Sequence, residues 1–164
     1  MNETKNYRSE IVDSIIPYAR ENQKIVLLVC DMGFGVIDSF KDQFPNRIFN
    51  MGIMEQGTVG IAAGMAMTGL IPIVYSIVNF IAFRAIEQIR NDVVQQGLNV
   101  KFISTGVNNY FKFLGNSHCC DEDDIKLMEI IGLNVYNPYG KNMIDFKKFI
   151  EKWITDKAPG YLRV

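Results

Sequence analysis

Two ionisable side chains, Glu55 and His118, have the chemistry and position of functional groups. Glu55 is the only Asp, Glu, Lys, Arg or His between Arg47 and Arg84, and it heads a segment rich in glycine and alanine. A carboxyl group held out of water favours its protonated form and can share a proton with a nitrogen heterocycle. The simpler interpretation is an acid in the first turn of a helix, where it complements the helix dipole.

His118, the only histidine, precedes Cys119 and Cys120. These three residues do not match a metal site, because adjacent cysteines point apart and the sequence has no Cys-x-x-Cys spacing and no second histidine. An odd number of cysteines also fits a reducing compartment better than a disulfide framework. We therefore expect no metal ligand in this chain, and a structural role is the simpler interpretation of His118.

Length and charge predict a single domain of ordinary size. The 164 residues suffice for one hydrophobic core, and a net charge of -1 provides no basic surface for nucleic acid or an anionic membrane. The apolar stretch 71–83 is interrupted by Pro72, Ser76 and Asn79, and the first ten residues lack the apolar core of a signal peptide. We expect one domain over residues 1–164, located in the cytoplasm, with neither nucleic acid nor a membrane as a partner.

Strands and helices alternate along the sequence. Apolar runs predict strands over 25–30, 47–50, 71–76, 99–104, 133–136 and 160–164. Helical patterns fall between them, over 4–22, 36–43, 55–69, 80–96, 121–131 and 142–153. This alternation predicts a doubly wound α/β fold with a mostly parallel six-stranded sheet and helices on both faces.

Polar residues follow several of these strands. Asp31 should emerge at the carboxyl end of the first strand, where open α/β sheets bind ligands, although an Asx turn is the simpler interpretation. The long polar loop 105–120, which carries His118, has a length typical of functional loops. The acidic run 121–124 is most simply a helix cap with carboxylates that match the dipole.

Two ordered motifs resemble the pyrimidine-binding domain of the transketolase family. The first is Gly52-Ile-Met-Glu55-Gln56 with the small-residue helix after it, and the second is Phe80-x-x-x-Arg84-Ala-x-Glu87-Gln88-Ile-Arg-x-Asp92. In that family the glutamate of the first motif hydrogen-bonds the aminopyrimidine ring of thiamine diphosphate. The resemblance covers nearly the whole chain and implies the same thiamine-diphosphate-binding fold.

The resemblance implies catalytic roles for Glu55 and His118. Glu55 would sustain the imino form of the aminopyrimidine, whose exocyclic nitrogen can then take the proton from C2 of the thiazolium. The Gly-x-Ser-His118 loop is similar to the transketolase loop whose histidine faces the substrate, where it can hydrogen-bond a sugar oxygen or assist proton transfer. In the assembled enzyme this interpretation requires Glu55 to meet a heterocycle and not to be neutralised by a basic neighbour.

Four further residues are expected to contact the cofactor. Phe80 could simply belong to the core, but it aligns with an aromatic ring that stacks on the pyrimidine, and Phe83 aligns with a further aromatic of the same pocket. Met54, which precedes the glutamate in the first motif, and Asp31 complete the expected cofactor-binding set.

The family's motif for magnesium and diphosphate, Gly-Asp-Gly followed further along by Asn, does not occur in this sequence, and neither does the family's third, carboxyl-terminal domain. The resemblance therefore implies a split enzyme, in which a partner subunit supplies the diphosphate-binding domain and Mg²⁺. Because such domains form sites at a dimer interface, a heterotetramer with two of each subunit is expected.

Positions that contact the substrate depart from transketolase proper. Gly35 stands in place of a serine, Gly106 in place of a histidine, Asn137 in place of an arginine and Leu114 in place of an aspartate. Since a phosphate group favours charge-assisted donors, an ordinary pentose phosphate fits poorly. We expect an unusual sugar acceptor, such as a nucleotide-linked one.

The sequence thus predicts a subunit of a two-chain, thiamine-diphosphate-dependent, transketolase-like enzyme that transfers a two-carbon ketol unit. One alternative is a beta-type subunit of a 2-oxo acid decarboxylase or dehydrogenase, which shares the glutamate and the split arrangement; the motif from Phe80 to Asp92 favours transketolase. The other is a catalytically silent partner module, against which the intact Glu55, Phe80 and His118 argue.

Overall fold

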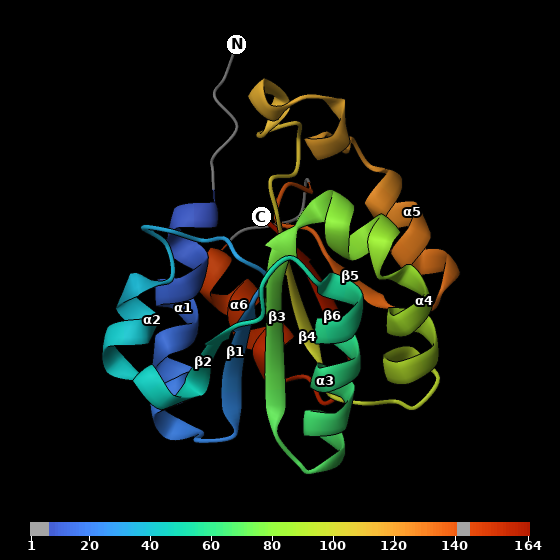
Figure 1. Ribbon diagram of the computed structural model, residues 1–164. Helices are drawn as coiled ribbons and strands as arrows, with labels where there is room; N and C mark the ends of the chain where they lie inside the picture. The colour runs from blue at the N-terminus through green and yellow to red at the C-terminus, as the bar shows by residue number, and fades with distance from the viewer. Residues whose placement is uncertain (1–6, 141–144) are drawn as a thin grey trace.

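Six parallel strands form one sheet between two layers of helices in the computed structural model, which describes residues 7–140 and 145–164 (Figure 1). The strands lie in the order β2-β1-β3-β4-β6-β5, and each neighbouring pair is parallel. Their bounds are β1 Ile25–Val29, β2 Ile48–Asn50, β3 Ile71–Ile77, β4 Lys101–Thr105, β5 Asn134–Tyr136 and β6 Gly160–Arg163. The predicted doubly wound α/β fold is confirmed, and the sheet is wholly rather than mostly parallel.

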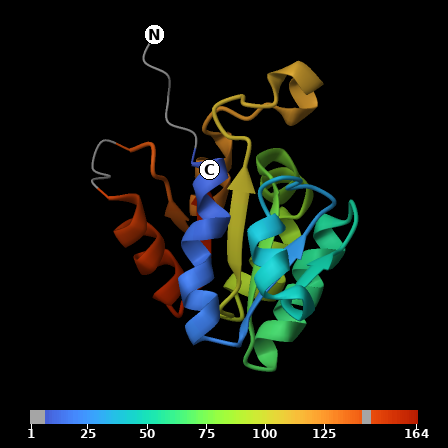
Figure 2. The ribbon, with the colours of Figure 1, turned by 90° about the vertical axis from the view of Figure 1, so that its left-hand side faces the viewer.

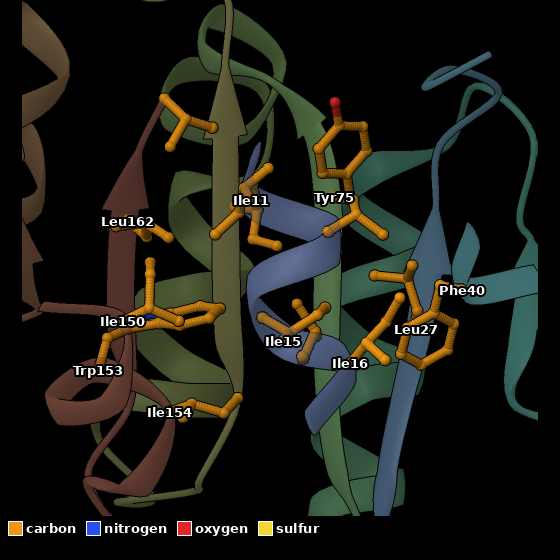
Figure 3. Packing of buried hydrophobic residues seen from close by; sticks show 14 of the residues in the cluster. Ile11, Ile15, Ile16, Leu27, Phe40, Tyr75, Ile150, Trp153, Ile154 and Leu162 are labelled. Carbon is orange, nitrogen blue, oxygen red and sulfur yellow. The ribbon is translucent and has the colours of Figure 1, made fainter. Parts of the chain in front are cut away.

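Helices α1 (Arg8–Glu21), α2 (Asp38–Gln43) and α6 (Phe146–Thr155) cover one face of the sheet (Figures 1 and 2). Their core is shown in Figure 3, where Trp153 of α6 lies near Leu162 of β6 and Ile16 of α1 lies near Leu27 of β1. The Trp153 indole, fully buried, donates to the carbonyl of Gly160 at 3.1 Å, so this large side chain is satisfied as well as packed.

The other face is covered by α3 (Glu55–Met67), the α4 segment (residues 80–94) and α5 (Asp123–Ile130). The predicted helix over 80–96 is present, but much of it has π geometry. Phe80–Arg84 and Ile89–Val94 are π-helical, and the α-helical turn α4 (Ile86–Gln88) lies between them. Such wide turns occur often at functional sites.

The acidic run 121–124 does more than cap a helix, which corrects the simpler interpretation. The N-cap Glu122 makes no side-chain capping bond, whereas Asp124 is fully buried in an ion pair with Arg163 of β6, at 2.7 Å between Oδ2 and Nε. Tyr161 also donates its hydroxyl to Oδ2, at 2.9 Å. This buried pair fixes the start of α5, immediately after the loop that carries His118, to the sheet.

All six predicted helices differ in their bounds from the structure by one to four residues at one end or both, and the first and last differ most. The first begins at Arg8, and residues 4–6 of the prediction lie outside the described residues; the last begins at Phe146 with Asp145 as its cap, and 142–144 also lie outside them. Within the described ranges, every helix falls short of the combined length and apolar character needed to cross a bilayer.

Candidate functional site

Residues expected in the site lie at the carboxyl edge of the parallel sheet. Asp31 follows β1, Glu55 follows β2, Phe80 follows β3 and His118 lies in the loop after β4. The chain connects β1 to β2 through α2 on one face and β2 to β3 through α3 on the other, so the strand order reverses around β1. Ligands of open α/β sheets bind at such switch points.

Glu55 is the first residue of α3, and its carboxylate is buried, with 1% of the residue exposed. Ser76 of β3 donates its hydroxyl to Oε1 at 2.9 Å. Arg84 donates from Nη1 to Oε2 at 2.5 Å. Glu55 is therefore buried, as expected. In this chain by itself, however, Arg84 neutralises its charge. The interpretation given above requires that this ion pair be absent from the assembled enzyme.

Arg84 also connects Glu55 to the aromatic side of the site. Its guanidinium carbon lies 4.2 Å from the centroid of the Phe80 ring, within cation–π range. A second neighbour of Phe80 is His118, whose ring is edge-on at 5.1 Å between centroids. The structure therefore brings Glu55, Arg84, Phe80 and His118 into one row, which we call the Glu55–His118 row.

The loop that carries His118 is attached to the α4 segment. Asn79, which precedes Phe80, donates its side-chain amide to the carbonyl of Cys119 at 2.7 Å. The Nδ1 atom of His118 lies 3.0 Å from the hydroxyl of Ser117, and its ring is partly buried against Phe80. The histidine is thus held at the edge of the row, where it can exchange a proton with a bound molecule.

Asp31 and Met54 lie at the same edge of the sheet, and both are exposed. Asp31 has a left-handed backbone (φ 48°) and accepts from the Asn50 side-chain amide at 3.1 Å, while its own N–H donates to Asn50 Oδ1 at 3.1 Å. This reciprocal pair ties the ends of β1 and β2 together, and the Asx-type bond at this edge is made by Asn50, whose Oδ1 also accepts from the N–H of Gly52 at 3.0 Å. Met54 leads directly into Glu55 and presents an apolar side chain to solvent.

Phe83 faces a different part of the surface. It lines a cavity of about 340 Å³ beneath the loop after β4, together with Asn109, Lys112, Asn116 and Cys119 among others, and neither Glu55 nor Phe80 lines that cavity. The structure thus brings Phe80 into the row and leaves Phe83 one helical turn away from it.

The two buried cysteines, Cys30 and Cys120, are poor nucleophiles. Burial raises the pKa of the Cys30 thiol, which lies near Glu55 and donates to the Thr58 hydroxyl, to about 11. Burial likewise raises the pKa of Cys120 to about 11. Both are therefore neutral thiols at pH 7. In the part of the chain that the structure describes, no three His, Cys, Asp or Glu side chains gather as metal ligands.

Sequence reasoning did not assign roles to Ser76 and Arg84. Ser76 carried a signal, since a hydroxyl near the end of an otherwise apolar buried strand must find a partner, and it points at the Glu55 carboxylate. Arg84 was visible as part of the second motif, but its contact with an acid 29 positions earlier depends on the packing of the α4 segment against α3.

Comparisons with known proteins identify the family of this chain. The sequence matches the family described as "Transketolase, pyrimidine binding domain" over residues 3–164. It is 33% identical over 158 residues to the 6-deoxy-6-sulfo-D-fructose transketolase subunit SqwH of a Clostridium species, covering 96% of this chain and 48% of the relative. It is 28% identical to an apulose-4-phosphate transketolase subunit of Actinobacillus succinogenes, covering all of this chain and 52% of the relative.

A solved structure described as "Split gene transketolase, inactive beta4 tetramer" superposes with a TM-score of 0.82 at 32% identity, covering 98% of this chain and 50% of that one. The chain thus spans about half the length of these relatives. The match over nearly all of its residues, together with a buried glutamate at the carboxyl edge of a parallel sheet, shows that this chain belongs to the transketolase pyrimidine-binding domain family.

Proposed function

We propose that residues 1–164 form a pyrimidine-binding domain that works as one subunit of a thiamine-diphosphate-dependent, transketolase-like enzyme transferring a two-carbon ketol unit. The observation that carries the proposal is the Glu55–His118 row, in which a buried carboxylate, an aromatic ring and an imidazole follow one another at the switch point of the sheet. We place the enzyme in the cytoplasm, in carbohydrate metabolism.

The residues present fit the aminopyrimidine half of the coenzyme. The Arg84 guanidinium is a planar cation that donates to Oε2 of Glu55 and lies over the Phe80 ring. A protonated aminopyrimidine is also planar, also donates an N–H to a carboxylate, and also stacks on an aromatic face. A group with the chemistry of the coenzyme ring is therefore already accommodated between these two side chains.

When bound, thiamine diphosphate supplies the nucleophilic carbon that accepts the ketol unit. Glu55 would hold the proton on the pyrimidine ring nitrogen, and Ser76, by donating to Oε1, would keep Oε2 turned toward that nitrogen. Phe80 would stack on the ring. His118 would give or take a proton at a substrate oxygen. Asp31, Met54 and Phe83 are proposed as further cofactor contacts.

A second, partner chain is proposed because the site is incomplete. The sequence has no Gly-Asp-Gly motif, so we assign the diphosphate and Mg²⁺ to the partner, in a heterotetramer of two subunits of each kind. The exposed side of α3, with the residues that lead into it, supports contact with a partner. It is apolar and uncharged, with exposed glycines among the side chains of Ile53, Met54, Ile61 and Met67. Apolar surface of this kind marks contact sites in soluble proteins.

An unusual sugar is proposed as the substrate. Gly106 has a left-handed backbone (φ 82°), and a Cβ there would overlap the ring of Phe111, so a histidine has no room at this position. Gly35 also has a left-handed backbone (φ 74°). The two relatives described above are named for a sulfonated sugar and for apulose 4-phosphate, which supports a substrate outside the common pentose phosphates.

The test is ketol transfer by this chain assembled with a diphosphate-binding subunit, thiamine diphosphate and Mg²⁺. Glu55→Gln should lower kcat/KM by about a hundredfold or more, since it removes the acid–base group, whereas Glu129→Gln, the same change on the exposed side of α5, should not. Equal activity of the Glu55 variant and wild type would indicate a silent module.

The donor separates the remaining alternatives. Turnover of 2-oxo acids and not of ketoses would identify the decarboxylase or dehydrogenase alternative. Turnover of xylulose phosphate with ribose phosphate at a rate comparable to that of sulfonated or branched sugars would refute the proposed substrate preference.

A further inference from the structure

Arg84 occupies the two contacts that a bound aminopyrimidine needs. It pairs with Oε2 of Glu55 at 2.5 Å and lies 4.2 Å from the centre of the Phe80 ring. The other carboxylate oxygen, Oε1, already accepts a hydrogen bond from the Ser76 hydroxyl at 2.9 Å. A pyrimidine that bonds Oε2 and stacks on the same face of Phe80 would lie where the Arg84 guanidinium lies, so the two groups cannot both hold these positions.

The pairing is reasonable for a chain that has not yet met its coenzyme. Glu55 is 1% exposed, and a buried carboxylate without a counter-charge is costly. Arg84 supplies that charge. It is also the only Lys or Arg between Arg47 and Arg90, so no other basic side chain of this stretch could take its place.

Arg84 is also placed so that it can leave. Its side chain is 39% exposed, whereas Ser76, which bonds the other oxygen of the Glu55 carboxylate, is buried. It ends the π-helical segment Phe80–Arg84, on a wide turn at the surface of the α4 segment. A long, flexible side chain with one end near solvent can rotate outward without moving the backbone.

We propose that Arg84 is an internal competitor of the coenzyme, which holds the Glu55 carboxylate and the Phe80 ring until the aminopyrimidine displaces it, and which thereby sets the affinity for thiamine diphosphate. The proposal rests on the proposed function, because it assumes that the coenzyme binds at Glu55. It makes Arg84 an affinity-determining residue whose removal should strengthen binding, the opposite of what loss of a ligand contact would do.

The experiment is calorimetric titration of thiamine diphosphate, with Mg²⁺ present, into the enzyme assembled from this chain and its diphosphate-binding partner. Arg84→Met should lower Kd by about two- to fivefold, the range expected for removing a partly exposed ionic contact from the competing state. Arg90→Met is the matched control, since Arg90 lies on the same helical segment, is exposed, and bonds Asn91 rather than Glu55. Its Kd should equal that of wild type.

An unchanged or higher Kd in Arg84→Met would overturn the proposal. Glu55→Gln in the same titration separates this failure from that of the proposed function: if Glu55→Gln leaves Kd unaltered, the coenzyme does not bind at Glu55 at all. If Glu55→Gln weakens binding while Arg84→Met does not strengthen it, the site stands and the competition is wrong.

Crystal structures of the wild-type assembly with and without thiamine diphosphate give a second test that does not depend on any variant folding. The Arg84–Glu55 contact should be present without the coenzyme and broken with it. An intact contact beside a bound aminopyrimidine would overturn the proposal, because both groups would then share the carboxylate.

Discussion

Replacing Asp124 with asparagine should destabilise the fold strongly, although the two side chains have nearly the same shape. The carboxylate receives Nε of Arg163 at 2.7 Å and Nη2 at 3.1 Å, and the exposed fractions of the two side chains are 0% and 1%. An asparagine amide would turn a donor toward one of these donors and leave a buried guanidinium without a counter-charge. Removing one member of a buried pair costs about 3–5 kcal/mol.

Asp123→Asn is the natural control, because it makes the same change one residue earlier. Asp123 pairs with Lys126 at 3.2 Å, but the two side chains are 67% and 72% exposed, so the loss should stay below about 1 kcal/mol. Urea unfolding of both variants measures the difference at constant m-value. For a chain of this size, about 3–5 kcal/mol corresponds to a fall in Tm of roughly 6–20 °C.

The reasoning fails if the two variants unfold within about 1 kcal/mol of each other, a difference too small for the loss of a buried charge pair. It also predicts that Asp124→Leu combined with Arg163→Met costs less than the sum of the two single changes, because the double variant leaves no buried charge behind. Strictly additive costs would show that the two side chains do not depend on each other.

Two further predictions concern backbone space and pH. Gly106→Ala should cost more stability than Gly69→Ala in thermal unfolding, by about 1–3 kcal/mol, because both have a left-handed backbone but only at Gly106 would the new Cβ overlap Phe111; equal costs would contradict the overlap. Desolvation by burial lowers the pKa of Lys101, whose ammonium donates to the Asp156 and Ala158 carbonyls, to about 8. The unfolded chain therefore binds more protons between about pH 8 and 10.5, so this group should add stability as pH rises across that window, by at most about 1.4 kcal/mol per unit, and Lys101→Met should flatten the slope of unfolding free energy against pH; parallel slopes in the two proteins would contradict it.

The layered sheet could be predicted because its strands are recognisable from local sequence. The run Ile25–Val29 is apolar at every position, as expected for a parallel strand covered on both faces, and all five residues are buried. The absence of charge around Glu55 in the sequence likewise predicted its burial correctly. These inferences need only neighbours along the chain.

Contacts between distant segments were not predictable in the same way. The acidic run at the start of α5 suggested a helix cap, yet Asp124 pairs with Arg163, 39 positions away. This contact exists because β6, which carries Arg163, lies inside the sheet between β4 and β5. Arg84 similarly reaches Glu55 only through the packing of two helices, and π geometry in the α4 segment cannot be inferred from periodicity. The roles in cofactor binding and catalysis of all six predicted site residues stay predictions: Glu55, His118, Phe80, Phe83, Asp31 and Met54.

The glycines on the outer side of α3 affect how well this chain will tolerate substitutions in a folding assay. A Cβ at Gly60 or Gly64 would meet no atom within 4 Å in the chain by itself, and alanine is the better helix former. A survey that scores folding of the separate chain would rank both positions as freely replaceable. If a partner packs closely against this helix, the same substitutions obstruct assembly, so selection at these positions acts through the complex and is invisible in the monomer.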